Sequence, residues 1–136
     1  MPKKIYVAGP LFNTHERMYL DQITEALERA GYETFLPHRD AGILGDLSDI
    51  RERERLFRSD MQALDECDIV VALLTGADHD SGTCGEIGYA YAKGKPCFGI
   101  SDDVRRMNNL IWGLCGEGTA IAHNIEALVA LVTSNR

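Results

Sequence analysis

Short apolar runs alternate with amphipathic stretches along most of the chain. The run DIVVALL (68–74) is almost entirely apolar, as expected of a strand that is buried on both faces of a sheet. A weaker strand signal lies near the end, over residues 119–122. The other runs that are typical of strands are KIYVAG (4–9), YETFLP (32–37) and KPCFGI (95–100).

Helical patterns fill the segments between the apolar runs. Asn13 or Thr14 is expected to cap the first helix, which continues to Ala30 and is ended by Gly31. Residues 38–49 are expected to form a loop. Further helices are expected over residues 50–67, around Glu86, over 107–114 and over 124–133.

This alternation predicts a doubly wound α/β fold with a mostly parallel, five-stranded sheet. No repeat, low-complexity segment or linker interrupts residues 1–136, so we predict a single domain. Right-handed crossovers place every strand-to-helix loop at one edge of such a sheet, and ligands bind outside the carboxyl ends of the strands. The candidate ligand-binding loops are residues 8–13, 37–40, 75–83 and 101–109.

Composition and charge narrow the choice of partners. The chain has 136 residues, of which 45% are hydrophobic and 26% charged, and its net charge is −7. Nucleic acid and anionic membranes would repel so acidic a chain, so we predict neither as a partner. No apolar run is long enough for a membrane span or a signal peptide. The four cysteines form no CxxC pair, which predicts reduced thiols and a cytoplasmic location.

Glu86, in the segment DSGTCGEIGYAYA (80–92), is the first candidate for chemistry. Thr83 and Glu86 have the T-x-x-E spacing of a capping box, in which Glu86 would only stabilise the start of a helix. Capping does not explain the surrounding glycines, because a glycine inside a helix costs about 1 kcal/mol relative to alanine. Glycine does allow a ligand to approach the backbone closely. The glycines around Glu86 are Gly82, Gly85 and Gly88.

Other polar side chains have simple structural interpretations. Tyr6 lies in the first predicted strand and is expected in the core, with Glu86 as a partner for its hydroxyl because the first and third strands should be adjacent. Asp60 is interpreted as a solvated helix residue, and Asp80 as a turn residue. The alternating charges of RERERLFR (51–58) indicate a solvated helix face.

The sequence lacks the motifs of several common sites. It contains no G-x-S-x-G elbow, no G-x-x-x-x-G-K-[ST] loop and no G-x-G-x-x-G fingerprint, which disfavours phosphate transfer and dinucleotide binding. No metal is predicted, because no pair of histidines has i, i+4 spacing and none joins the cysteines in a metal-binding pattern. The histidines are His15, His38, His79 and His123.

The order of several motifs resembles the nucleoside 2-deoxyribosyltransferase family. YVAGPLF, FLPHRD, D-x-G-T-x-x-E-x-G-Y-A and NNLIWG follow one another over roughly residues 4–115. The resemblance implies a flavodoxin-like fold and a homo-oligomer built from dimers. It also implies transfer of 2-deoxyribose between nucleobases through a covalent glycosyl-enzyme, as in nucleoside salvage, with slow hydrolysis as a side reaction. Nucleosides and free nucleobases would be the partners, and no cofactor would be needed.

The same resemblance implies roles for particular residues. Glu86 would be the nucleophile, and Tyr6 would orient it. Asp60 would contact the base and shuttle its proton, which is a general acid–base role. Asp80 would hold the sugar 5′-hydroxyl, and Asn109 would reach the site of a neighbouring subunit.

Further residues are expected to line the substrate site. His38 and Asp40 lie in a segment that resembles the loop on the base side of the family's site. The family often carries a glutamine where His38 stands, which leaves the base preference open. Gly9 and Phe12 belong to the first loop, and Gly82 lies beside the nucleophile.

Three alternatives remain open. A hydrolase of the same superfamily would cleave nucleoside 5′-monophosphates, but the Asp80 carboxylate would repel the phosphate, although Ser81 and Arg17 leave some room for it. A phosphoribohydrolase of the cytokinin-activating type is disfavoured, because its paired glycine is absent. A non-catalytic nucleotide-sensing module on the same fold would need neither the Tyr6–Glu86 pair nor a second acid.

Overall fold

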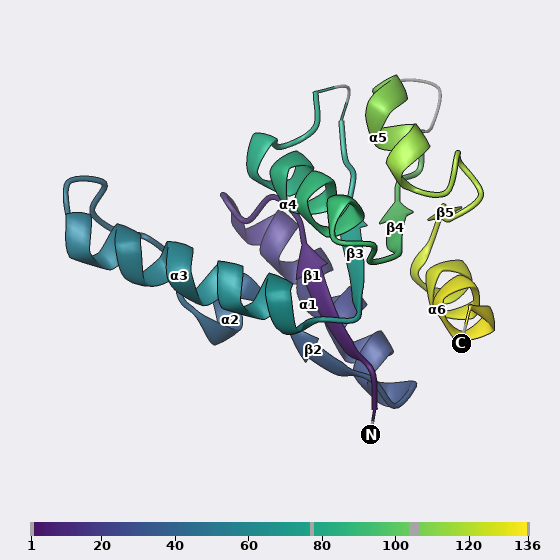
Figure 1. Cartoon of the computed structure of the whole chain (residues 1–136), viewed down its shortest axis with the longest axis horizontal. Coiled ribbons are helices and arrows are strands. Elements are labelled where there is room, and N and C mark those ends of the chain that lie inside the picture. Colours follow the sequence, from purple (N-terminus) through teal and green to yellow (C-terminus); the bar gives the residue numbers. More distant parts are fainter. Residues whose placement is uncertain (1, 77, 104–106, 136) are drawn as a thin grey trace.

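A five-stranded parallel sheet in the order β2-β1-β3-β4-β5 forms the centre of the molecule (Figure 1). The computed structural model describes residues 2–76, 78–103 and 107–135. The order 2-1-3-4-5 is that of flavodoxin-like folds, so the predicted fold class is confirmed, with every strand pair parallel. The strands are β1 (Lys4–Ala8), β2 (Glu33–Phe35), β3 (Ile69–Leu73), β4 (Cys97–Ile100) and β5 (Ile121–Ala122).

The helices occupy the predicted segments, with one addition. Residues Pro37–Asp40, expected in a loop, form the single turn α2. Pro37 suits the first helical position, because its fixed φ is helical and its missing N–H needs no partner there. The other helices are α1 (Thr14–Arg29), α3 (Ile50–Glu66), α4 (Ser81–Ala92), α5 (Asn109–Leu114) and α6 (Ile125–Ser134).

The sheet is buried on both faces, which explains its apolar strands. On β1, Ile5 and Val7 pack with residues of α1 and α6, whereas Tyr6 and Ala8 pack on the side of α3 and α4. All five residues of β3 are buried in the same alternating way. Burying each Ile, Val or Leu side chain stabilises the fold by about 1.5–3 kcal/mol.

Capping residues set where the long helices begin. Of the two predicted caps for α1, the structure uses Asn13, whose side chain accepts a hydrogen bond from the Glu16 amide at 2.9 Å. Gly31, with φ of 98°, follows the end of this helix as predicted. All four cysteines are free.

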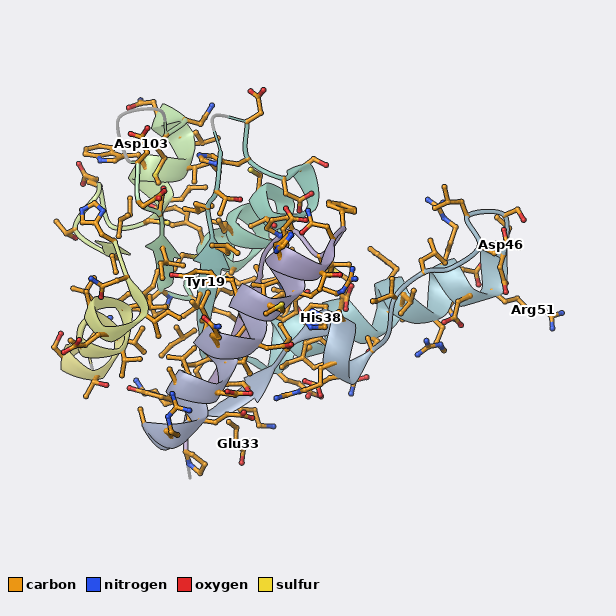
Figure 2. All side chains as sticks on the ribbon, turned by 180° about the vertical axis from the view of Figure 1, so that it is seen from behind. Tyr19, Glu33, His38, Asp46, Arg51 and Asp103 are labelled. Carbon is orange, nitrogen blue, oxygen red and sulfur yellow. The ribbon has the colours of Figure 1, made fainter. Side chains whose placement is uncertain are left out.

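The first half of α3 and the loop before it extend away from the sheet (Figure 1). Asp46 and Arg51 lie at the far end of this projection (Figure 2). Only the second half of α3 packs against the body, where Leu64 joins the core. Within the described residues, no helix combines the length and the apolar character that a membrane crossing requires.

Candidate active site

A pocket of about 520 Å³ opens at the carboxyl edge of the sheet, between the first loop, α2, α3 and the start of α4. Three carboxylates line it, Asp60, Asp80 and Glu86. The remaining lining residues are Gly9, Leu11, Phe12, Pro37, Phe57, Met61, Leu64, Ser81, Gly82, Gly85 and Tyr89. One part of the pocket is therefore acidic, and much of the rest is apolar.

Tyr6 and Glu86 meet beneath this pocket. Tyr6 is fully buried on β1, its ring stacks on Phe35 with centroids 5.5 Å apart, and its hydroxyl donates a hydrogen bond to Glu86. The contact forms because β1 pairs with β3, which places α4 over Tyr6. The predicted pairing of Tyr6 with Glu86 is thus present in the structure, whereas the catalytic roles of the two residues stay predictions.

The surroundings of Glu86 favour its protonated form. Burial raises the pKa of Glu86 from 4.5 to about 7, and the negative charges of Asp60 and Asp80 act in the same direction. The hydrogen bond from Tyr6 opposes these effects. Burial, and then the charge of Glu86, raises the pKa of Tyr6, so this hydroxyl remains a donor at neutral pH.

Asp60 differs from its interpretation as a solvated residue, because it lines the pocket and is only partly exposed. Burial raises the pKa of Asp60 from 3.8 to about 6. Its Oδ1 atom is buried and has no hydrogen-bond partner among the described residues. A carboxyl group that titrates near neutral pH and has a free oxygen is suited to exchanging a proton with a ligand.

Asp80, rather than the Thr83–Glu86 pair, caps α4. The Oδ2 atom of Asp80 accepts hydrogen bonds from the Thr83 amide at 2.9 Å and from the Thr83 hydroxyl at 2.8 Å. The capping-box interpretation of Glu86 is therefore wrong, because α4 begins at Ser81 and its first turn ends before Glu86. Capping uses Oδ2 of Asp80. The other carboxylate oxygen, Oδ1, has no hydrogen bond to a described residue and is therefore available to a ligand.

The glycines of the site serve two different purposes. A Cβ atom on Gly85 would meet no atom within 4 Å, so its absence leaves open space in the pocket. Gly82 also lines the pocket, whereas Gly88 does not. A Cβ atom on Gly9 would approach Cδ2 of Leu20 to 2.7 Å and Cβ of Leu73 to 3.0 Å, so this glycine allows close packing just after β1.

The predicted substrate-binding residues are only partly brought together. Phe12 lines the pocket and is 77% exposed at its rim. The side chains of His38 and Asp40 are hydrogen-bonded away from the pocket, to Asp21 and within residues 36–40 respectively. Asn109 is exposed at the start of α5 and does not line the pocket of its own chain. The substrate-binding roles of these residues stay predictions.

Sequence reasoning missed the apolar wall that α3 contributes. Phe57, Met61 and Leu64 all line the pocket, and Phe57 is 64% exposed. Phe57 lies in the charged run 51–58, and the charges of its neighbours indicated a solvated helix face rather than a pocket wall. The i, i+4, i+7 spacing of these three residues is the signal that could have identified the wall, because it places them on one helix face.

Cations are absent from the part of the pocket that the structure describes, since its lining residues include no Lys, Arg or His. Arg17 donates from Nη1 to the Leu11 carbonyl at 2.9 Å and so braces the first loop. Among the described residues, no group of three or more His, Cys, Asp or Glu side chains is arranged to hold a metal ion.

A larger hollow, of about 670 Å³, lies between the end of α4, β4 and α6. Its described lining contains Lys95 but no Asp or Glu. Lys95 donates to the carbonyls of Leu64 at 2.5 Å and of Asp65 at 2.7 Å, so its charge is used to hold the end of α3. The pocket at the carboxyl edge is therefore the better candidate for chemistry.

Comparison with known families agrees with the motifs. The sequence model of the family "Nucleoside 2-deoxyribosyltransferase" matches residues 5–126. The chain belongs to this family. Its members act on nucleosides and nucleobases. The matched residues include Tyr6, Asp60, Asp80 and Glu86.

Solved structures share the fold of this nucleoside 2-deoxyribosyltransferase family member. A 2-deoxyribosyltransferase from Bacillus psychrosaccharolyticus has a TM-score of 0.80 at 24% identity, over 93% of this chain and 90% of that one. A 2-desoxiribosyltransferase from Leishmania mexicana has a TM-score of 0.74 at 22% identity, over 99% of both chains. The Clostridium botulinum CMP N-glycosidase BcmB has a TM-score of 0.64 at 21% identity, over 98% and 100%.

These identities are low enough that the structural matches establish the fold alone. No curated protein sequence matches the chain significantly. The chemistry of this member of the nucleoside 2-deoxyribosyltransferase family therefore has to be argued from its own residues. They offer two carboxyl groups with raised pKa, a tyrosine hydroxyl bound to one of them, and an apolar wall beside the other.

Proposed function

We propose that this protein transfers 2-deoxyribose from one nucleobase to another through an ester between the sugar and Glu86. The observation that carries the proposal is the hydrogen bond from Tyr6 to Glu86 at the base of a pocket that also holds Asp60. Nucleophile, orienting hydroxyl and proton-exchanging acid are the three groups that such a double displacement requires.

In the first step, the ionised Glu86 carboxylate attacks C1′ of the deoxyribose. The glycosidic bond breaks through an oxocarbenium-like state, and its electron pair moves onto the base nitrogen. The protonated Asp60 then supplies a proton to the departing base, which prevents a negative charge from building up on it. The products are a free base and a sugar ester on Glu86.

In the second step, an acceptor base attacks C1′ of the ester. The bond to Glu86 breaks and its electrons return to the carboxylate, while Asp60 takes the proton that the acceptor loses. Two displacements at C1′ retain the configuration. Water in place of the acceptor would release free deoxyribose, which is the slow hydrolysis expected as a side reaction.

The two parts of the pocket suit the two parts of a nucleoside. Asp80 and Gly85 lie beside Glu86, where the sugar would bind, and Asp80 could accept a hydrogen bond from the 5′-hydroxyl. Phe57 and Met61 lie on either side of Asp60 along α3, where a flat base would cover apolar surface.

A free 5′-hydroxyl is favoured over a 5′-phosphate. Asp60, Asp80 and Glu86 give the pocket three acids, and the described lining offers no cation to balance a phosphate. Arg17 is already bound to the Leu11 carbonyl. The resemblance of fold to a CMP N-glycosidase keeps the monophosphate hydrolase as the alternative to test.

One assay separates the proposal from its alternatives. The protein is incubated with deoxyadenosine or deoxyinosine, and separately with deoxycytidine 5′-monophosphate, each with a foreign base. Formation of the new deoxynucleoside supports transfer. Sugar or sugar phosphate without a new nucleoside would indicate a hydrolase, and no turnover of any substrate would indicate a sensing module. Mass spectrometry of enzyme quenched with a slow substrate should find the sugar on Glu86.

The proposal includes a homodimer in which Asn109 of each chain serves the site of the other. This is supported by the position of Asn109, which is exposed and outside the pocket of its own chain. Mixing inactive Glu86→Ala chains with inactive Asn109→Ala chains should restore activity, because a mixed dimer contains one intact site. Failure of the mixture to recover activity, with mixed dimers demonstrated by mass spectrometry, would contradict the shared site.

A further inference from the structure

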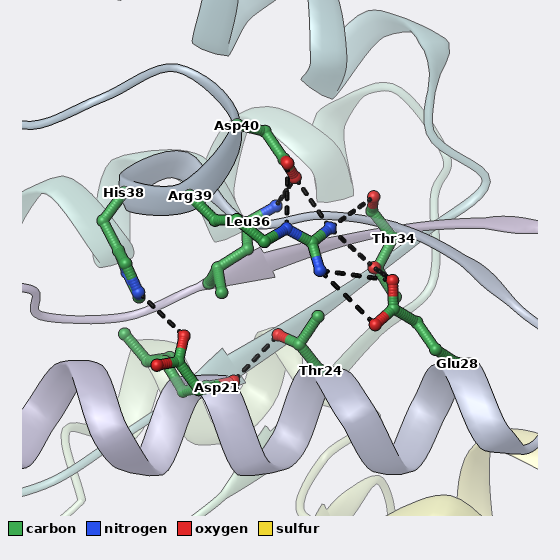
Figure 3. Close-up of polar contacts among 9 residues, drawn as sticks. Asp21, Thr24, Glu28, Thr34, Leu36, His38, Arg39 and Asp40 are labelled. Carbon is green, nitrogen blue, oxygen red and sulfur yellow. Dashed lines mark hydrogen bonds and ion pairs between the residues drawn. The ribbon is translucent and has the colours of Figure 1, made fainter.

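The short helix α2 forms one wall of the pocket, and its side away from the pocket is hydrogen-bonded to α1 and β2. Pro37 lines the pocket together with Phe57 and Asp60. The residues that follow it turn the other way, toward α1 and β2, and Figure 3 shows their polar contacts. None of these three residues, 38–40, lines the pocket.

His38 connects the wall to α1. Its Nε2 atom lies 2.9 Å from Oδ1 of Asp21, and its side chain is only 10% exposed (Figure 3). A carboxylate accepts hydrogen bonds but does not donate them, so Nε2 carries the hydrogen. Nδ1 of His38 is buried without a hydrogen-bond partner among the described residues, which leaves Asp21 as the contact that fixes the ring.

Asp40 and Arg39 close the turn on its other side. Asp40 accepts from the Leu36 amide at 2.8 Å and from Arg39 at 2.8 Å and 2.9 Å. Partial burial alone would raise the pKa of Asp40, but these hydrogen bonds hold it below its ordinary value. Arg39 also donates hydrogen bonds to Glu28 on α1 and to Thr34 on β2, so the turn that follows Pro37 is bound to both of these elements (Figure 3).

We propose that His38 is a positioning residue, which sets the Pro37 wall of the base-binding part of the pocket through its hydrogen bond to Asp21. This inference rests on the proposed function. It assigns a role to Asp21, a residue of α1 that does not line the pocket and is 49% exposed. Because His38 follows Pro37 directly, the hydrogen bond that holds its ring also restrains the backbone next to Pro37.

A double-mutant cycle tests the proposal. His38→Ala and Asp21→Ala should each raise the KM for the acceptor base roughly tenfold, the effect of losing a hydrogen bond to a charged group, with kcat changed less. The double variant should be no worse than either single variant, because both remove the same contact. Glu25→Ala is the matched control, since Glu25 borders the same outer hollow as Asp21 and His38.

Two results of the cycle would overturn the proposal. A raised KM in His38→Ala with an unchanged KM in Asp21→Ala would mean that His38 contacts the substrate itself. An unchanged KM in both variants would mean that the pair does not set the wall. A lower melting temperature alone, without a change in KM, would indicate a purely structural role and would also count against it.

Conservative variants of His38 identify which of its ring nitrogens makes the hydrogen bond that affects the KM. The side-chain amide of glutamine can place its N–H near the position of Nε2, whereas that of asparagine reaches only the position of Nδ1. His38→Gln should therefore keep the KM of the wild type, and His38→Asn should behave like His38→Ala. The opposite order would indicate that Nδ1 is used, which the Asp21 contact cannot explain.

Hydrogen exchange provides a readout that does not depend on turnover. The amides of Asp40 and Ala41 donate to Leu36 and Pro37 at 2.8 Å and 2.9 Å, so they report on the closure of α2. In Asp21→Ala these amides should exchange about tenfold faster than in Glu25→Ala. Unchanged exchange would refute the positioning role even if the wild type proved to have no transferase activity. Faster exchange in an inactive wild type would instead refute only the proposed function.

Discussion

The Tyr6 hydroxyl on β1 donates a hydrogen bond to the Glu86 carboxylate on α4, which joins two residues 80 positions apart. Tyr6 is completely buried, so its direction is set by the sheet and by its stacking on Phe35. A carboxylate held by a fixed donor keeps one orientation, and orientation of a nucleophile is a large part of its reactivity.

Tyr6→Phe should slow the exchange reaction by about tenfold to a hundredfold, which corresponds to one hydrogen bond to a charged group. The ring and its contact with Phe35 remain, so the fold should be retained. Because the Tyr6 hydrogen bond lowers the pKa of Glu86, its loss should move the limb of the pH–rate profile near pH 7 to higher pH. The variant is compared with the wild type over pH 5–9. An unchanged rate and an unchanged limb would contradict an orienting role for Tyr6.

Glu86→Gln should abolish exchange and change how stability depends on pH. The pKa of Glu86 is raised from 4.5 to about 7, so the folded protein binds this proton more tightly than the unfolded chain does. The free energy of unfolding of the wild type therefore falls as the pH rises between these values. Glutamine does not titrate, so the variant lacks the part of this fall that Glu86 causes, which is of order 1–3 kcal/mol. Above pH 7 the variant should therefore have the larger free energy of unfolding.

Denaturant unfolding at pH 4.5, 6 and 7.5 measures the effect on stability. Glu25→Gln is the control, because it removes an exposed acid of α1. Burial also raises the pKa of Asp60, so part of the fall in stability should persist in Glu86→Gln. Residual exchange at the wild-type rate would exclude Glu86 as the nucleophile.

The pH dependence of kcat/KM should be bell-shaped, with limbs near pH 6 and 7. Asp60 has a pKa of about 6 and Glu86 a pKa of about 7, and their charges are coupled. The reaction needs one proton in this pair, on Asp60, and an ionised Glu86. Because Glu86 has the higher pKa, most singly protonated pairs carry the proton on Glu86, and the reactive arrangement is the minor one. Its population still peaks between the two values, because it is a constant fraction of the singly protonated pairs. A rate that stays constant from pH 5 to 8 would contradict the assignment of these two residues.

Asp80→Asn should weaken substrate use much more than it weakens the fold. Asparagine caps helices about as well as aspartate, so the hydrogen bond from the Thr83 amide should persist, and unfolding should change by less than about 0.5 kcal/mol. The KM for the nucleoside should rise roughly fivefold or more, through a weaker contact with the 5′-hydroxyl. Thr83→Val is the control for the cap. Equal losses of activity and of melting temperature would leave Asp80 with a capping role only.

Phe57→Ala should raise the KM for the base about tenfold, because it removes an aromatic surface from the pocket. Stability should hardly change, since this side chain is 64% exposed. Phe57→Leu should show a smaller effect. Ile50→Ala is the matched control, because Ile50 is 61% exposed on the same helix and does not line the pocket. A similar change in both variants would argue against contact between Phe57 and the base.

Short-range sequence patterns were sufficient to predict the strands and all of the helices except α2. The apolar run of β3 and the capping Asn13 both lie within a few residues of the structure they specify. Residues 37–40 were misjudged because a single helical turn has too few positions to show a period. Residues 51–58 are largely exposed, as predicted, but the place of Phe57 in the pocket was missed because its charged neighbours dominate the local pattern.

By itself, the sequence determined the alternation of strands and helices, and hence the edge of the sheet at which the candidate acids gather. Only the tertiary structure decided what each acid does there. Asp80 caps α4, Glu86 is bound by Tyr6, and Asp60 is half-buried in the pocket lining rather than solvated. The reason is physical, because burial and pairing depend on residues that are distant along the chain. The pKa of a carboxyl group is therefore set only once α3 and α4 have packed against β1.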